Sequence, residues 1–163
     1  MKPALLVIDV QKAYFNKTST EPLEDAIEYI NAAIDIFRAK ELPVVAILHM
    51  DKQNGHIPGS EGFDFPDSVK TKPEDLHIHK EYSNAFAHTP LAEELNKMGV
   101  DTIVITGYLA EGCVLATYKG APEHGFVPII LRNSIASPNG ENARFVENIS
   151  NLISYGALAK FLE

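Results

Sequence analysis

Several features are scarce in this sequence, and each scarcity excludes a class of protein. The 163 residues contain one cysteine and no tryptophan. A single cysteine cannot form a disulfide within the chain, which favours a reducing compartment. Basic residues number 14 against 22 acidic ones, the net charge is -8, and Lys and Arg form no cluster. This balance argues against nucleic acid and anionic membranes as partners.

Long hydrophobic runs are also missing. The N-terminal segment is apolar for only about seven residues before Asp9, too short for a membrane span, and it has no signal-cleavage pattern. The glycine-rich loops that bind nucleotide cofactors are absent, so we expect no cofactor. We therefore expect a cytoplasmic protein with no membrane partner. Since 45% of the residues are hydrophobic, we expect residues 1–163 to form a single domain around one core.

What the sequence does contain is an alternation of strand and helix patterns. Four apolar runs without polar alternation are typical of strands buried on both faces, at 4–10, 43–49, 101–107 and 127–133. Helical patterns lie between and after them, at 23–40, 89–99, 111–125 and 142–154. Shorter elements are expected as a strand at 76–80 and a last strand or turn around 155–158. This order predicts a three-layer α/β/α sandwich with a mainly parallel central sheet.

Reactive side chains follow three of these strands. Ligands of such sheets bind at the carboxyl ends of the strands, where Asp9, Lys80 and Cys113 occur. A carboxylate in an apolar run is costly to bury alone. Asp9 therefore either organises a loop through backbone N–H groups or acts as a general acid/base with a raised pKa. Lys80 could neutralise both Asp9 and a thiolate.

The position of Cys113 suggests more than packing. A lone cysteine is more often a small hydrophobic residue than a nucleophile. Cys113, however, follows a buried strand at the point where a helix begins, and free N–H groups at a helix start lower a thiol pKa. Backbone amides of the same turn could form an oxyanion hole.

The six histidines show no strong metal-binding spacing. His49, Asp51 and His56, in and next to the long loop at 51–76, could supply metal ligands. Most histidines in proteins are solvated or hydrogen-bonded rather than bound to a metal, so we expect no bound metal.

Three segments, taken in order, resemble the isochorismatase-like cysteine hydrolases, which include nicotinamidases and N-carbamoylsarcosine amidases. The segments are LLVIDVQKAYF, HKEYSNAF and IVITGYLAEGCVLAT. The resemblance implies a Rossmann-like fold and a catalytic triad of Asp9, Lys80 and Cys113. It also implies a cis peptide between Tyr108 and Leu109, with the amides of Leu109 and Cys113 forming the oxyanion hole.

The resemblance further implies an activity. We expect hydrolysis of a small amide or carbamoyl C–N bond through a thioester at Cys113, with Asp9 as general acid/base and Lys80 as charge stabiliser. Family members usually form homodimers or homotetramers, so a homo-oligomer is expected. Aromatic residues near the motifs are candidates for the substrate pocket: Tyr14, Phe15, Phe63, Tyr82, Phe86 and Tyr108.

The chain also departs from the family pattern. Ala110 stands where Thr is usual, a common Asp is missing at Arg132–Ser134, and the nicotinamidase metal pattern is absent. These departures leave alternatives open. One is a catalytically silent member that binds a small molecule or acts as a scaffold, and another is a metal-assisted, nicotinamidase-type amidase. A third is a redox thiol protein, although the chain has no resolving cysteine.

Overall fold

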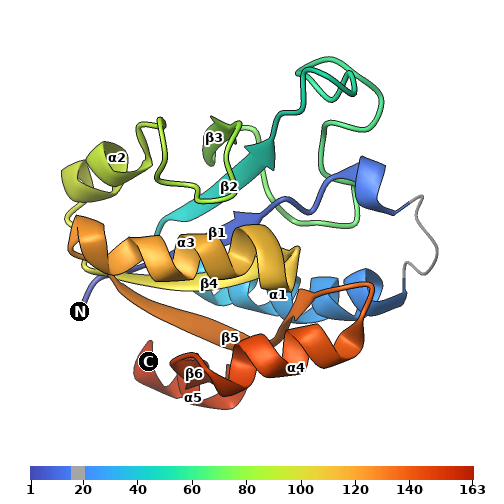
Figure 1. The fold of residues 1–163 in the computed structure, drawn as a ribbon. Helices are drawn as coiled ribbons and strands as arrows, with labels where there is room; N and C mark the ends of the chain where they lie inside the picture. Colours follow the sequence, from blue (N-terminus) through green and yellow to red (C-terminus); the bar gives the residue numbers. More distant parts are fainter. Residues whose placement is uncertain (16–20) are drawn as a thin grey trace.

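The centre of the molecule is a parallel sheet of six strands (Figure 1). The structure is a computed structural model, and it describes residues 1–15 and 21–163. All neighbouring strands pair in parallel, in the order β3-β2-β1-β4-β5-β6. The strands are β1 (Pro3–Ile8), β2 (Val44–His49), β3 (Leu76–Lys80), β4 (Thr102–Tyr108), β5 (Val127–Ala136) and β6 (Leu152–Ile153). The predicted parallel sheet is confirmed.

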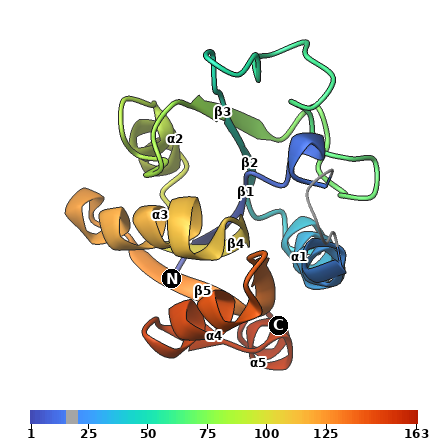
Figure 2. The same ribbon diagram turned by 45° about the vertical axis from the view of Figure 1, so that its right-hand side comes forward.

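Helices cover both faces of the sheet (Figure 2). One face carries α1 (Glu21–Ala39) and α5 (Tyr155–Phe161). The other carries α2 (Leu91–Lys97), α3 (Leu115–Gly120) and α4 (Gly140–Asn148). Three short turns of helix connect these elements: η1 (Lys12–Tyr14), η2 (Ala110–Val114) and η3 (Ala121–His124). The molecule is thus the predicted α/β/α sandwich, and no helix in its described part is both long and apolar enough to cross a bilayer.

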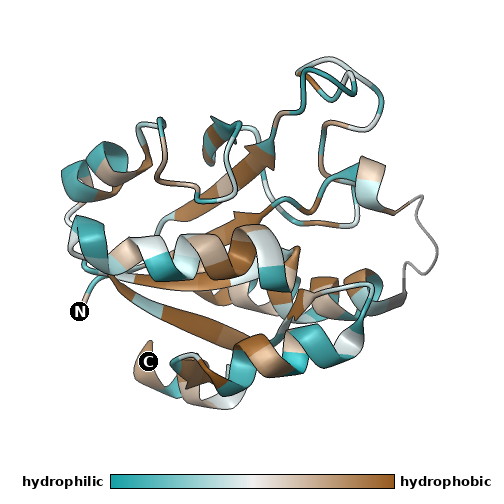
Figure 3. Cartoon of the chain, in the orientation of Figure 1, coloured by the Kyte–Doolittle hydropathy of each residue, from teal (hydrophilic) through white to brown (hydrophobic). Residues whose placement is uncertain are grey.

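The central strands are buried on both sides. In β1, Leu5 and Val7 join the hydrophobic cluster under α1, whereas Leu6 and Ile8 join the cluster under α2 and α3. Each fully buried side chain of this kind contributes about 1.5–3 kcal/mol. This two-sided burial explains why the strand sequences are continuously apolar, as the colours of Figure 3 show.

The strand order reverses between β1 and β4. From β1 the chain builds outward through β2 and β3, then returns to the other side of β1 and builds outward again. In sheets of this type, the crevice for a ligand lies at this reversal. Gly107 of β4 is needed there, because its φ is 116° and a Cβ would lie 2.1 Å from the carbonyl oxygen of Ile8.

The C-terminal region differs from the prediction. The helix expected at 142–154 ends at Asn148 and is followed by β6. The segment 155–158, expected as a strand or turn, belongs to helix α5, so that prediction was wrong. Ser154 caps this helix, since its side chain accepts a hydrogen bond from the Ala157 N–H. Packing of Leu158 against the sheet then holds the short helix in place.

Candidate active site

The structure brings Asp9, Lys80 and Cys113 together at the carboxyl edge of the sheet. Asp9 directly follows β1, and its N–H donates to the Ile47 carbonyl of β2 at 2.8 Å. Its φ of 54° lies in the left-handed region, which Asp tolerates better than most residues with a side chain. Lys80 ends β3, and Cys113 lies in η2 directly after β4.

The Lys80 ammonium is the centre of this site. Its Nζ lies 2.9 Å from Asp9 Oδ2 and 3.2 Å from Cys113 Sγ. The same nitrogen lies 3.1 Å from the Tyr82 carbonyl oxygen and 3.0 Å from His49 Nδ1. The side chains of Lys80 and Asp9 are only 0% and 2% exposed. A buried cation needs such complete polar surroundings, because water no longer solvates it.

The second oxygen of Asp9 is in a different situation. Asp9 Oδ1 is buried and accepts no hydrogen bond from any residue that the structure describes. Buried acceptors are almost always satisfied, so this oxygen is unusual. Cys113 Sγ lies within 4.8 Å of an Asp9 carboxylate oxygen. Asp9 thus presents one carboxylate oxygen without a close hydrogen-bond partner near a thiol, and an interaction between the two side chains contributes to the pKa of each.

Burial dominates the protonation of these two acids. It raises the pKa of Asp9 although Lys80 opposes the change. Burial, together with the charge of Asp9, raises the pKa of the Cys113 thiol to about 11. The expectation of a lowered thiol pKa was therefore wrong, because desolvation outweighs the nearby ammonium. The charge of Asp9 contributes to the raised pKa of Cys113, so the titrations of the two groups influence each other.

The turn that carries Cys113 is held by its own backbone and by a neighbouring loop. The Tyr108–Leu109 peptide bond is cis, at the position that the family resemblance implied. The Leu109 carbonyl accepts hydrogen bonds from the amides of Gly112 and Val114. Glu111 Oε1 accepts from Ser137 Oγ at 2.9 Å and from Asn142 Nδ2 at 2.8 Å, which ties the turn to the segment after β5. Ala110, where the family usually has Thr, is fully buried.

Two of the predicted pocket residues, Tyr14 and Tyr108, contact each other, and Tyr14 is close enough to Asp9 and Cys113 for their charges to affect its pKa. The rings of Tyr14 and Tyr108 have their centres 4.9 Å apart. Burial raises the pKa of Tyr14, and the negative charges of Asp9 and Cys113 add to the effect, which reflects its closeness to both. Tyr14 and Tyr108 are therefore the best-placed candidates for the pocket wall.

The other four aromatic candidates have different surroundings. Phe63 is 1% exposed and packs with Ala46 and Leu48 in a small hydrophobic cluster. Phe86 is also buried and stacks on Phe126. Both are core residues. Phe15 is half-buried against the cluster under α1. Tyr82 has an exposed ring, 5.0 Å from that of His88, and contributes its carbonyl oxygen to Lys80.

His49, Asp51 and His56 do not come together as metal ligands. Asp51 Oδ2 accepts a hydrogen bond from Asn54 at 2.6 Å, and Asp51 and His56 exchange backbone hydrogen bonds in a hairpin. His49 instead lies with Asp9 and Cys113, and ligand atoms of these three residues are within 4.8 Å of one another. All three contact the Lys80 ammonium, which thus fills the place that a metal cation would take.

Two contacts of this site could not be read from the sequence. One is the bond between His49 and Lys80. The other is the clamp that Gln11 forms on the main chain of His49, in which Gln11 Nε2 donates to the His49 carbonyl at 3.0 Å and the His49 N–H donates to Gln11 Oε1 at 2.8 Å. Gln11 is 2% exposed. Its position two residues after Asp9 in a buried segment was the available signal.

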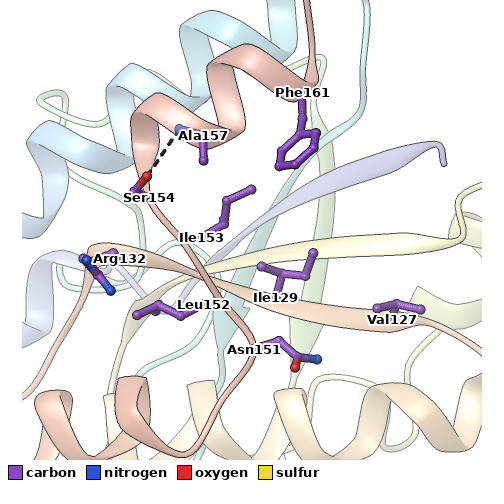
Figure 4. Close-up of a pocket in the computed structure, with 9 residues that line it drawn as sticks. All are labelled: Val127, Ile129, Arg132, Asn151, Leu152, Ile153, Ser154, Ala157 and Phe161. Atoms are coloured by element: carbon purple, nitrogen blue, oxygen red, sulfur yellow. Dashed lines mark hydrogen bonds between the residues drawn. The ribbon is translucent and has the colours of Figure 1, made fainter.

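A separate cavity lies beside β5, β6 and α5 (Figure 4). The side chains of Leu152, Ile153 and Phe161 form apolar walls, and Arg132 and Asn151 add polar groups. None of the nine residues drawn in Figure 4 is a predicted site residue.

The fold and the site together define an α/β protein with a cysteine centre at the reversal point of its sheet. Comparison with known proteins agrees with this class. The isochorismatase domain family matches residues 3–154. The Bacillus subtilis (strain 168) isochorismatase family protein YddQ is 32% identical over 142 residues, which cover 84% of this chain and 79% of YddQ. The chain belongs to the isochorismatase family and is a hydrolase of that family.

Two more distant proteins extend the comparison. N-carbamoylsarcosine amidase from Arthrobacter sp is 28% identical over 159 residues, covering 82% of this chain and 59% of the amidase. An isochorismatase-like hydrolase from Alkaliphilus metalliredigens has a crystal structure that covers 100% of both chains with a TM-score of 0.89. At 22% identity, this likeness shows the common fold.

Proposed function

We propose that the protein is a cysteine hydrolase that cleaves a small amide or carbamoyl C–N bond through a thioester at Cys113. One observation carries the proposal. The buried Lys80 ammonium contacts both Asp9 Oδ2 and Cys113 Sγ, while Asp9 Oδ1 has no partner among the described residues. The N-carbamoylsarcosine amidase among the relatives supports the choice of a C–N bond.

In the first half of the reaction, Asp9 takes the proton of the Cys113 thiol. The thiolate attacks the carbonyl carbon, and the charge moves to the carbonyl oxygen. The amides of Leu109 and Cys113 hold this oxyanion, and one such donor contributes about 3 kcal/mol. Lys80 keeps the site electrically balanced throughout. The protonated Asp9 then gives its proton to the leaving nitrogen as the C–N bond breaks.

In the second half, Asp9 removes a proton from a water molecule that attacks the thioester. The C–S bond breaks, and the proton returns from Asp9 to the Cys113 sulfur. The raised pKa of Asp9 suits both halves, because a carboxylate with a higher pKa is a stronger base and its acid form still releases the proton readily.

The test measures ammonia or amine release from a panel of small primary amides and N-carbamoyl compounds. Turnover should fall at least about a thousandfold in Cys113→Ser and in Asp9→Asn. Asp51→Asn is the matched control, because this carboxylate lies in the neighbouring hairpin and bonds Asn54; it should keep its activity. Mass spectrometry of the wild type, quenched in acid during turnover, should find an acyl group on Cys113, and Cys113→Ser should carry no thioester.

Two outcomes would overturn the proposal. Cys113→Ser could retain wild-type turnover, which would remove the thioester from the reaction. Alternatively, the wild type could bind panel compounds saturably and hydrolyse none, and this result would favour the silent binding protein.

We also propose that the protein works in the cytoplasm as a homodimer or homotetramer. The resemblance to a family whose members usually associate supports the oligomer, and Phe145 and Phe161 are two exposed rings that an interface could cover. Sedimentation equilibrium tests it, and a monomer at micromolar concentration would contradict it.

A further inference from the structure

The His49 side chain has a place in the site that the proposed reaction does not use. Lys80 Nζ has three N–H bonds and four polar neighbours within 3.2 Å, and one of these is His49 Nδ1 at 3.0 Å, which accepts when the ring carries its proton on Nε2. The other three are Asp9 Oδ2, the Tyr82 carbonyl and Cys113 Sγ. Each acceptor restricts where the ammonium can sit. His49 approaches it from β2, next to the β3 strand that carries Lys80.

His49 is itself firmly placed. It pairs in register with Lys80 across β2 and β3. Its backbone N–H and C=O are both bonded by the buried side chain of Gln11, at 2.8 and 3.0 Å. Gln11 lies two residues after Asp9, so one segment carries the carboxylate and fixes the main chain of His49. With its main chain held at this place in the strand register, the His49 side chain starts from a fixed point next to Lys80.

We propose that His49 is a positioning residue, which accepts a hydrogen bond from Lys80 at Nδ1 and thereby keeps the ammonium between Asp9 and Cys113. The inference rests on the proposed function for its consequence in turnover, but the contact itself can be tested without a substrate. An ammonium has only donors, so Nδ1 must carry no proton. The ring is therefore neutral, with its proton on Nε2.

The charges around His49 agree with a neutral ring. Burial and the positive charge of Lys80 lower the pKa of His49, and His56 acts in the same direction. Asp9 and Asp51 oppose them more weakly. A lowered pKa keeps the ring neutral at neutral pH. When the pH falls below that pKa, Nδ1 gains a proton, the acceptor is lost, and two positive charges face each other.

The first test is direct. Nitrogen NMR of protein labelled at the histidine ring nitrogens reports which nitrogen carries the proton, and the His49→Asn variant identifies the His49 signals. An unprotonated Nδ1 and a protonated Nε2 at neutral pH are expected. A proton on Nδ1, or a ring charged at neutral pH, would overturn the proposal. This outcome does not depend on whether the protein hydrolyses any amide.

The second test is the rate at which iodoacetamide alkylates Cys113 at pH 8. His49→Leu removes the acceptor, and His49→Asn replaces it with an amide oxygen near the Nδ1 position. Loss of one hydrogen bond to an ammonium corresponds to at least about a tenfold change. We expect His49→Leu to be alkylated about that much more slowly, because a displaced ammonium no longer stabilises the thiolate. His49→Asn should stay near the wild-type rate.

A control separates positioning from general damage to the sheet. His79 lies one residue before Lys80, but its ring packs edge-on against Phe63, away from the site. His79→Leu should leave the alkylation rate unchanged. Equal rates in His49→Leu and wild type would refute the proposal. So would an equal slowing in His49→Leu and His49→Asn, since the acceptor would then not matter.

If the protein hydrolyses amides, the pH profile gives a third reading. In the wild type, turnover should fall at low pH as His49 gains a proton. This fall should be missing in His49→Asn, because asparagine cannot gain a proton at that position. An acid limb that persists unchanged would contradict the role of His49. Failure to find any substrate would count against the proposed function only, since the NMR and alkylation results stand independently.

Discussion

Each edge of the sheet carries a pair of opposite charges, and the two pairs differ in how fully they are satisfied. At the amino edge, Arg38 near the end of α1 bonds Asp75, directly before β3. Asp75 Oδ1 accepts from Arg38 at 3.1 Å, and Oδ2 accepts from Arg38 at 2.7 Å and from the Lys72 N–H at 2.6 Å. Both oxygens of the Asp75 carboxylate accept hydrogen bonds, and the pair links helix α1 to strand β3.

At the carboxyl edge, the pair of Lys80 and Asp9 is more deeply buried but less complete. Only Oδ2 of Asp9 is bonded, and Oδ1 is left without a partner among the described residues. The comparison separates an ion pair that only holds the fold together from one that is suited to chemistry. The Asp9 carboxylate has an oxygen without a hydrogen-bond partner near a thiol, and burial raises its pKa.

The largest effect is expected when the pair at the carboxyl edge is broken. Lys80→Met keeps the volume but leaves the Asp9 carboxylate buried without its cation. We expect the free energy of unfolding to fall by about 3–5 kcal/mol. Urea unfolding followed by circular dichroism measures it.

The double variant Asp9→Asn/Lys80→Met serves as the control for this change. It removes both charges, so most of the lost stability should return. A single variant as stable as the wild type would contradict the buried pair.

A smaller effect is expected at the amino edge. Arg38→Met removes both bonds to Asp75, whose side chain is 8% exposed. The free energy of unfolding should fall by about 2 kcal/mol, the usual range for hydrogen bonds to a charged group. Turnover and the alkylation of Cys113, measured in parallel, should stay at the wild-type level. A loss of reactivity with stability intact would show that the two edges are not independent.

The third effect is a slope of stability with pH. The pKa of Asp9 is raised in the folded state above its ordinary value of 3.8, so between these two values the folded protein binds more protons than the unfolded chain. Asp9 therefore makes the protein less stable as the pH rises through that window, by at most about 1.4 kcal/mol per pH unit. Urea unfolding at a series of pH values, compared between wild type and Asp9→Asn, isolates this slope. Parallel curves would contradict the raised pKa.

The smallest effect concerns a pair that lies fully on the surface. Lys97 Nζ lies 2.8 Å from Glu93 Oε1 and 2.8 Å from Glu94 Oε1 on α2. Water and salt screen such pairs, so Lys97→Gln should not change the urea midpoint measurably. A clear loss of stability would mean that distance, rather than burial, decides the strength of these pairs.

Much of the fold could be predicted from the sequence, because β1, β2 and β4 are buried on both faces and read as continuous apolar runs. Their ends then indicated where Asp9 and Cys113 would meet. The contact between His49 and Lys80 could not be predicted, because it depends on the register between β2 and β3. From the sequence, His49 was considered only as a candidate metal ligand with Asp51 and His56, and no bound metal was expected.

Two further features, the pKa of Cys113 and helix α5, could not be predicted from the sequence, for physical reasons. The pKa of Cys113 depends on how much of the thiol is enclosed and on which charges face it, and only the folded chain determines both. Helix α5 is short, buries only Leu158, and depends on the Ser154 cap and on the sheet below it. A seven-residue segment has too few apolar positions for a helical period to stand out.

The order of the strands also bears on how the enzyme comes into being on the ribosome. β1 is synthesised first but lies in the middle of the sheet, between β2 and β4. A nascent chain that ends after β3 has Asp9 and Lys80 but lacks the thiol, and β1 still has one open edge. Cys113 meets its partners only when β4 docks along that edge, a contact between segments far apart in the chain. Until then the thiol lacks both the ammonium and the carboxylate, so a chain that ends before β4 cannot assemble the proposed centre.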